Sequence, residues 1–430
     1  MSSLKNRFKV AIGNTCINIT RYVYQCSKKG FWGQFFFSMY RFIFKIMNLS
    51  AFPIECYVSY NNKVPKSKLI TIETNRYGVS SEIISVNSDA EIKFYEYSLP
   101  DLLMLKSSNV DICGNSDVIV DTKNDCVISD VSHNLGSNIQ VIDGLLYRTR
   151  DNICVLRNNM CKEKEHIDSG IMISGKFCRN YYHVLLENFI KLLYIKRLEI
   201  PIEVPILVDR KTMEIPSLKR IFELLAVDLK RKIVSIKSGT IYHVDTLYSI
   251  NNVNKIPSHL LINTSDYNTY LYSKTALVEL RNTLLTNCSN KEFPKRVFIS
   301  RASTKRRNFN EDEVYEVLQK FGFEKIAPEL LTIEEQMTLF HNAEYIVAGS
   351  GAALTNLIFV REKCNVICFG ISSKGDEIPV FNTIANINGA NFLYFPRKTK
   401  ENGDVHSNYE IDCTQLECFL HQRIIDEHIK

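Results

Sequence analysis

The sequence Gly-Ser-Gly at residues 349–351 interrupts an apolar run, AEYIVAGSGAALTNLIFV at 343–360. Small residues between a buried strand and a helix are typical of a tight strand-to-helix turn, whose free backbone amides attract an anion. Ala352 and Ala353 leave room for phosphate oxygens to approach the first helical turn. Leu354 replaces the third small residue of the dinucleotide fingerprint, and no G-x-x-x-x-G-K-[ST] sequence occurs. The turn therefore predicts an anion site that is neither a dinucleotide site nor a P-loop.

A basic loop, RASTKRRNF, follows the predicted strand RVFIS at 296–300. Its cations are Arg301, Lys305, Arg306 and Arg307. This loop and the glycine turn both follow strands, so we expect them at the same sheet edge, where together they suit a diphosphate better than a single carboxylate. A solvated basic loop is the alternative. A nucleic-acid surface is disfavoured, because residues 51–430 sum to −2 and contain no recognised nucleic-acid-binding motif.

His183 and Glu187 lie four residues apart in NYYHVLLENFIKLLYIKRL, a predicted helix at 180–198. This spacing puts both side chains on one side of the helix. Histidine titrates near neutral pH and is the commonest general base. A histidine that packs in the core or caps a helix is the alternative.

No D-x-D sequence occurs in the chain, so the usual carboxylate pair for Mg²⁺ or Mn²⁺ is missing. The acidic run 311–313 is explained as compensation of a helix dipole, because it directly follows the predicted cap Asn310. The 13 cysteines are scattered, without a C-x-x-C pair, as expected for reduced thiols in a cytosol. The sequence thus predicts no metal and no cofactor.

Alternating strands and helices must position these residues. In the second half we predict strands at 296–300, 323–326, 345–348 and 365–369, separated by helices, which together describe one Rossmann-like domain. The first half begins with short β-type runs between residues 54 and 170, of which YVSY at 57–60 is one. After them, predicted helices at 180–198, 216–227 and 267–287 alternate with strands at 204–209, 232–236 and 244–250, which indicates a parallel α/β sheet.

Residues 1–50 contain eight lysines and arginines and no acidic residue. Read as a helix, this segment places Phe31, Phe35 and Met39 on one face and Arg41 on another, a pattern typical of a helix lying in a membrane surface. Its longest uncharged run is far shorter than the ~20 residues of a spanning helix. An amphipathic helix packed on the protein's own core is the alternative.

Four segments resemble glycosyltransferase family 61, which includes many bacterial capsular polysaccharide biosynthesis proteins. They are, in chain order, NYYHVLLENFIKLL, RVFISRASTKRRNFNEDEVYEVLQKFGFE, LTIEEQMTLFHNAEYIV and GSGAALTNLIF. The resemblance covers roughly Ser169 to Phe381. It implies a GT-B-like α/β fold, in which two Rossmann-like domains face a cleft and the C-terminal one holds most of a nucleotide-sugar donor. It also implies inverting transfer without an essential metal.

The resemblance further implies roles for individual residues. His183 becomes the catalytic base, with Glu187 either orienting it or acting as the base itself. The acceptor-side residues are Asn180 and Tyr181. The donor-binding residues are Arg301, Lys305, Arg306, Glu335, Gln336, Ser350, Gly351, Ala352, Thr355 and Asn356. Ser350 stands where many members have histidine, and Ala353 where many have glycine, which leaves the donor's identity open.

We therefore expect a basic segment at 1–50, an acceptor-side domain at 51–287, a nucleotide-sugar domain at 288–400 and a C-terminal tail at 401–430. The expected function is transfer of a sugar to a growing surface glycan or a lipid-linked glycan. The expected location is the cytoplasm, at the inner face of an anionic membrane. The alternative is an inactive, glycosyltransferase-like binding or scaffold protein of a glycan-assembly complex.

Overall fold

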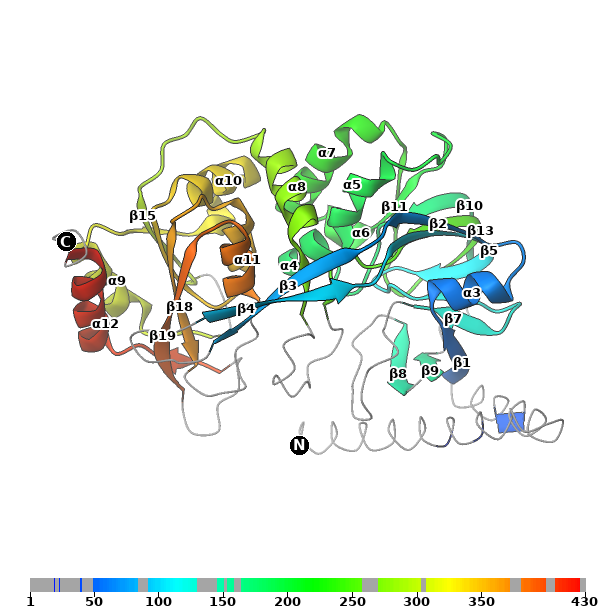
Figure 1. The fold of residues 1–430 in the computed structure, drawn as a ribbon, viewed down its shortest axis with the longest axis horizontal. Helices are drawn as coiled ribbons and strands as arrows, with labels where there is room; N and C mark the ends of the chain where they lie inside the picture. Colours follow the sequence, from blue (N-terminus) through cyan, green and yellow to red (C-terminus); the bar gives the residue numbers. More distant parts are fainter. Residues whose placement is uncertain are drawn as a thin grey trace. The chain divides into compact units, whose positions relative to one another are not determined.

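The structure is a computed structural model of the chain. It describes residues 49–83, 92–129, 145–150, 153–157, 164–256, 270–302, 307–371, 380–399 and 407–425, and also Ile19, Val23, Met39 and Tyr40. The chain forms two compact units (Figure 1). The first contains Met1–Asn75, Pro100–Lys219 and Ala226–Ile262, and the second contains Arg76–Leu99, Arg220–Leu225 and Asn263–Lys430. The domain limits given above stay predictions.

The first unit is built on an eleven-stranded sheet. Its strands are β1 (Leu49–Glu55), β2 (Lys68–Glu73), β5 (Leu102–Cys113), β6 (Ile119–Asp121), β7 (Cys126–Ile128), β8 (Leu146–Arg150), β9 (Ile153–Arg157), β10 (Glu165–Met172), β11 (Ile206–Asp209), β12 (Ile233–Ile236) and β13 (Ile241–Ile250). The order β12-β11-β10-β13 is parallel, and β13 then pairs antiparallel with β5. The predicted parallel α/β sheet is therefore present, joined to an antiparallel extension.

Two predictions in the first unit are wrong in detail. Residues 57–60 begin helix α3 (Tyr57–Lys63) instead of a strand, because Tyr57 and Tyr60 bury on one helical face. The predicted helix at 180–198 is not a continuous α-helix. It consists of α4 (Tyr181–His183), a π-helical turn (Val184–Asn188), a 3₁₀ turn (Phe189–Lys191) and α5 (Leu192–Ile195).

The remaining helices around this sheet are α6 (Arg210–Met213) and the 3₁₀ turn Val227–Leu229. Helix α7 (Pro216–Ala226) begins with proline in its first turn, where the missing N–H costs nothing. This confirms the predicted helix start.

The second unit contains a six-stranded sheet in the order β16-β15-β17-β18-β19-β20. These strands are β15 (Arg296–Ile299), β16 (Glu324–Ile326), β17 (Tyr345–Gly349), β18 (Asn365–Ile371), β19 (Asn391–Thr399) and β20 (Tyr409–Glu410). The first five strands in this order are parallel. In sequence order they read 2-1-3-4-5, a doubly wound arrangement whose ligand-binding switch point lies between β15 and β17.

Helices and a small sheet complete the second unit. They are β3 (Arg76–Ile83), β4 (Ile92–Leu99), β14 (Tyr272–Ser273), α8 (Lys274–Leu285), α9 (Glu311–Lys320), the 3₁₀ turn Pro328–Leu330, α10 (Ile333–Asn342), the 3₁₀ helix Ala352–Phe359, α11 (Phe381–Ile387), α12 (Cys413–Leu420) and the π-helical turn His421–Ile425. The core joins the strands to α9 and α12 through Phe298, Leu318, Val347, Ile367 and Leu416.

Three helix predictions in this unit need correction. The helix predicted from residue 267 begins only at Lys274, after a short strand, and is capped by the Ser273 hydroxyl. The segment after the glycine turn is a 3₁₀ helix. Asn310 precedes α9 but its side chain makes no capping hydrogen bond, because it is used to bind Ile411 through both backbone groups. Helix α10 begins with a capping box formed by Thr332 and Glu335.

The N-terminal helix inferred for residues 1–50 lies outside the described residues, apart from the four isolated positions and the start of β1. Within the part of the chain that the structure describes, no helix is both long and apolar enough to cross a membrane.

Candidate functional site

Two arginines meet at the switch point of the second unit. Arg301 lies two residues after the end of β15, and its Nη1 donates to the carbonyl oxygen of Ser350 at 3.1 Å. The Nη1 of Arg307 donates to the same oxygen at 2.9 Å. Glu311 anchors the strand end, because its carboxylate accepts from the Arg301 amide (2.9 Å) and the Ser300 hydroxyl (2.6 Å). The predicted meeting of the basic loop and the glycine turn is therefore present.

The two glycines of the turn make room for side chains of this site. A Cβ on Gly351 would lie 2.1 Å from Nη1 of Arg301, and a Cβ on Gly349 would lie 2.4 Å from the hydroxyl oxygen of Tyr409. Any larger residue would displace one of these groups. Arg301 and Tyr409 thus pack closely against the turn only because residues 351 and 349 are glycine. The sequence pattern of the turn does not show this requirement.

Arg397 and Tyr409 extend the basic site, and sequence reasoning missed both. The Arg397 guanidinium lies 4.7 Å from the ring centroid of Tyr409, and Arg397 is buried with 6% of its surface exposed. Burial raises the pKa of Tyr409 to about 12, against the opposing charges of Arg301, Arg397 and Arg307. Among the described residues, the Tyr409 hydroxyl and the Arg397 Nε and Nη1 have no hydrogen-bond partner. Buried polar groups normally have partners, so these atoms are suited to a bound anion.

The other predicted donor residues have different surroundings. Gln336 donates to the carbonyls of Pro328 and Leu331 and accepts from Asn356, which holds the loop after β16 against the 3₁₀ helix. Glu335 caps its own helix and pairs with Lys291 at 2.9 Å. Gln336, Asn356 and Glu335 therefore have structural roles in this unit.

Thr355 is fully buried, and its hydroxyl has no hydrogen-bond partner among the described residues. Ala352 is exposed at the start of the 3₁₀ helix. Lys305 and Arg306 lie outside the described residues.

In the first unit, His183 and Glu187 belong to a buried polar chain. The Nδ1 of His183 contacts Oε1 of Glu187, whose Oε2 lies 3.1 Å from the Lys176 ammonium. Lys176 also pairs with Asp117 at 3.1 Å. Burial opposes ionisation of Glu187, but the Lys176 charge and the His183 contact hold the pKa of this carboxyl below its ordinary value. Burial also disfavours the Lys176 ammonium, yet Asp117 and Glu187 raise its pKa.

These hydrogen bonds and ion pairs place His183 in a form that can accept a proton. An ionised Glu187 accepts the Nδ1 proton, so the neutral imidazole carries its lone pair on Nε2. Among the described residues no hydrogen bond involves Nε2, and 17% of the His183 side chain is exposed. Nε2 is therefore the atom that can accept a proton from a ligand. The structure thus brings His183 and Glu187 together as the spacing predicted, and adds Lys176 and Asp117.

The loop before the helix carries backbone strain beside His183. Phe177 has φ +57°, a left-handed conformation that is unusual for a bulky residue, and its ring stacks on His183 at 4.3 Å between centroids. Gly175 allows close contact with Asn188, because a Cβ there would lie 2.4 Å from the Asn188 Oδ1. The π-helical turn that contains Glu187 is a feature frequent at functional sites.

Asp209, at the end of β11, holds this loop in place. Its carboxylate accepts from the Ser174 hydroxyl (2.7 Å), the Gly175 amide (3.2 Å) and the Asn115 amide (2.5 Å). Burial raises the pKa of Asp209 to about 6. Asn180 caps α4 by accepting from the Tyr182 amide at 3.0 Å, and burial raises the pKa of Tyr181.

A pocket in the second unit lies at the amino ends of the strands of its sheet. It is lined by Tyr345, Asn365 and Asn391, which are the first residues of β17, β18 and β19. Because ligands of doubly wound sheets bind at the carboxyl ends of the strands, we place the functional site at the arginines and not in this pocket.

The structure is thus an α/β protein with an arginine-lined switch point in a doubly wound sheet, a place suited to an anionic ligand. The family described as glycosyltransferase 61 matches residues 181–367, from α4 into β18. This match confirms the predicted resemblance to glycosyltransferase family 61 over these residues. The match indicates a glycosyltransferase. No curated protein matches the chain.

Proposed function

We propose that this protein is an inverting, metal-independent glycosyltransferase that moves a sugar from a nucleotide-sugar donor to a growing surface glycan, such as a capsule or O-antigen. The observation that carries the proposal is the convergence of Arg301 and Arg307 on Ser350 at the switch point. In the proposed GT-B architecture the second unit binds the donor and the first unit binds the acceptor.

The donor's diphosphate would bind among Arg301, Arg307 and Arg397. Sugar transfer leaves a nucleoside diphosphate whose developing negative charge must be stabilised. Guanidinium groups present paired N–H donors that match phosphate oxygens. Two of these guanidiniums are already held by the Ser350 carbonyl, so little ordering remains when the diphosphate binds. This arrangement supports stabilisation of the leaving group by arginine in place of a metal.

The acceptor hydroxyl would lose its proton to Nε2 of His183. Glu187 would stabilise the imidazolium that forms, and Lys176 would keep Glu187 ionised. Inversion follows when the deprotonated acceptor oxygen attacks the anomeric carbon from the face opposite the diphosphate, so that one C–O bond forms as the other breaks. The proton ends on His183 and the electron pair on the diphosphate.

A panel of sugar nucleotides tests the proposal most directly. We expect one donor to be hydrolysed slowly without acceptor, with release of its nucleoside diphosphate, and faster with the correct glycan. Binding of nucleotides without any release would instead support the inactive, scaffold-type protein. Absence of nucleotide binding at every donor would contradict both the function and the site.

Arg301→Ala should weaken nucleoside-diphosphate binding by about 10- to 150-fold, since a charge-assisted hydrogen bond contributes ~1.5–3 kcal/mol. Calorimetry on the folded variant measures this loss. Arg361→Ala is the matched control, because Arg361 pairs with Glu344 at the exposed surface of the same unit. If the two variants bind nucleoside diphosphate equally well, Arg301 belongs to a solvated basic loop and not to a diphosphate site.

We also propose that residues 1–50 attach the protein to the inner face of the cell membrane, beside a lipid-linked acceptor. Eight cations without an anion favour anionic lipid, with ~1 kcal/mol per basic residue near the surface. Deletion of residues 1–48 should abolish co-sedimentation with anionic vesicles and leave nucleotide binding unchanged. Salt should weaken vesicle binding by the full chain, because it screens the cationic contribution. A deletion that unfolds the remainder would show a packed helix instead.

A further inference from the structure

The first unit carries a repeated sequence pattern on two neighbouring strands. Residues 166–168 of β10 read His-Ile-Asp, and residues 243–245 of β13 read His-Val-Asp. The strands are parallel, and their register pairs His166 with His243. Because side chains of a strand alternate between its faces, the histidine and aspartate of each strand share one face. Four side chains that bind metals in other proteins therefore lie side by side.

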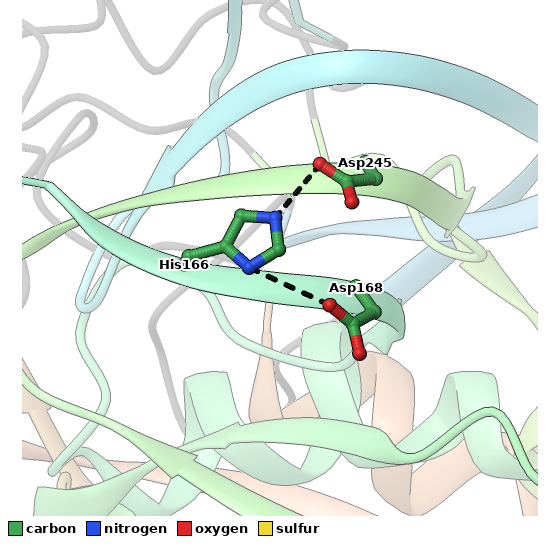
Figure 2. Close-up of side chains that lie close together, drawn as sticks. All are labelled: His166, Asp168 and Asp245. Carbon is green, nitrogen blue, oxygen red and sulfur yellow. Dashed lines mark hydrogen bonds and ion pairs between the residues drawn. The ribbon is translucent and has the colours of Figure 1, made fainter.

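Three of these side chains, His166, Asp168 and Asp245, offer ligand atoms that all lie within 4.8 Å of one another. Figure 2 shows His166 between the two aspartates, with Nε2 toward Asp245 and Nδ1 toward Asp168. The Asp245 Oδ1 lies 2.9 Å from Nε2 of His166 and 3.9 Å from Nε2 of His243. Zinc–ligand bonds of 2.0–2.2 Å place tetrahedral ligand atoms roughly 3.3 Å apart. The two distances lie on either side of this value.

Each histidine also has a carboxylate at its other nitrogen. The Nδ1 of His166 lies 3.5 Å from Asp168, and the Nδ1 of His243 lies 2.9 Å from Asp111 on β5. Asp111 is itself held by Lys164 at 2.6 Å. Histidines that bind metals almost always donate the second ring N–H to such a carboxylate, which fixes the tautomer and makes the free nitrogen a better ligand.

The charge of the cluster also suits a divalent cation. It contains Asp111, Asp168 and Asp245, while Lys164 is paired with Asp111. Asp168 and Asp245 then carry two negative charges, and among the described residues no lysine or arginine pairs with either.

We propose that His166 and His243, through Nε2, and Asp245, through its carboxylate, bind one Zn²⁺ ion, with Asp168 and Asp111 holding the two imidazoles. Imidazole and carboxylate ligands in a three-residue set leave one position for water. The site lies near the amino ends of β10 and β13, whereas the loop that leads to His183 follows the carboxyl end of β10. The ion therefore joins two strands and takes no part in sugar transfer. This proposal does not rest on the proposed function.

Zinc titration of the full-length, chelator-treated protein tests the site. We expect one Zn²⁺ to bind by calorimetry and to raise the melting temperature, and Mg²⁺ to do neither. His166→Gln and His243→Gln should each weaken Zn²⁺ binding by at least about 10-fold, and Asp168→Asn by about 10-fold, as for other partners of metal-bound histidines. All three side chains are at least one-third exposed, so these variants should fold.

Cobalt absorption distinguishes this site from thiol ligands elsewhere in the chain. Co²⁺ held by nitrogen and oxygen should give visible bands without the sulfur charge-transfer bands of a cysteine site. His421→Gln is the matched control, because His421 is exposed in the second unit and packs on Phe321. The proposal is wrong if Zn²⁺ leaves the melting temperature of the wild-type protein unchanged. It is also wrong if the double variant His166→Gln/His243→Gln binds Zn²⁺ with unchanged affinity, or if the Co²⁺ spectrum is of the sulfur type.

Discussion

Replacing His183 with alanine should lower sugar-transfer turnover by ~10²- to 10⁴-fold, the usual contribution of a general base. The Nδ1–H of His183 donates to the buried, ionised Glu187 carboxylate, which leaves the lone pair of Nε2 free to act as the base. Donor affinity should stay nearly unchanged, because the arginines proposed to hold the diphosphate belong to a different unit. Single-turnover kinetics and calorimetric donor binding on the same preparation measure the two effects separately.

His421→Ala controls for the loss of an imidazole as such, since His421 lies outside both proposed sites. The stability of the His183→Ala protein in urea must also be compared with that of the wild type. A joint loss of stability and turnover would identify His183 as a packing residue against Phe177. Full turnover in a stable variant would transfer the role of base to another residue, with Glu187 tested next.

The sequence predicted β15, β16, β17 and β18 of the second unit because their signals are local, whereas β19, β20 and the small sheet were not predicted. Each of the predicted strands is a short run of β-branched and aromatic residues, as in RVFIS before Arg301, and each helix has its own start or stop signal. Gly322, with φ +76°, follows the end of α9, as is typical of glycine after a helix. The doubly wound order then follows from alternation of strands and helices.

The residues that completed the site could not be predicted from local patterns. Arg397 and Tyr409 follow the basic loop by about a hundred positions, and only the order of β18, β19 and β20 brings them to it. Lys176 and Asp117 are similarly joined to Glu187 by sheet topology. A lysine at 176 is an ordinary loop residue in the sequence, and only its burial shows that it must be paired.

The two H-x-D triplets, at residues 166–168 and 243–245, are visible in the sequence, but their meaning is not. Either triplet alone is unremarkable in a sequence, and the two lie far apart. Their meaning depends on β10 and β13 being neighbours in a register that pairs His166 with His243.

Replacing Lys176 with methionine should lower the free energy of unfolding by about 3–5 kcal/mol, the cost of leaving a buried charge without its partner. Only 2% of the Lys176 side chain is exposed, and its ammonium lies 3.1 Å from both Asp117 and Glu187. Methionine fills similar space, so the loss reports charge and not a cavity. Urea unfolding measures the change. Lys196→Met is the matched control, because Lys196 and Asp228 form an exposed pair for which less than ~1 kcal/mol is expected.

The pH dependence of the stability of the Lys176→Met variant shows whether Glu187 is the buried carboxylate that loses its partner. In the wild type the folded pKa of Glu187 lies below its ordinary 4.5, so its contribution to stability is present above that pH and is lost as the pH falls through the folded pKa. Without the Lys176 ammonium, only the His183 contact opposes burial, so the pKa of Glu187 should rise. Stability of the variant should then increase on mild acidification, where the wild type is still unaffected. Adding Glu187→Gln should restore part of the lost stability and abolish this acid-side gain, since the buried group is then neutral at every pH. Additive losses in the double variant would show that Lys176 and Glu187 do not interact, and would remove the basis for assigning Lys176 a role in keeping Glu187 ionised.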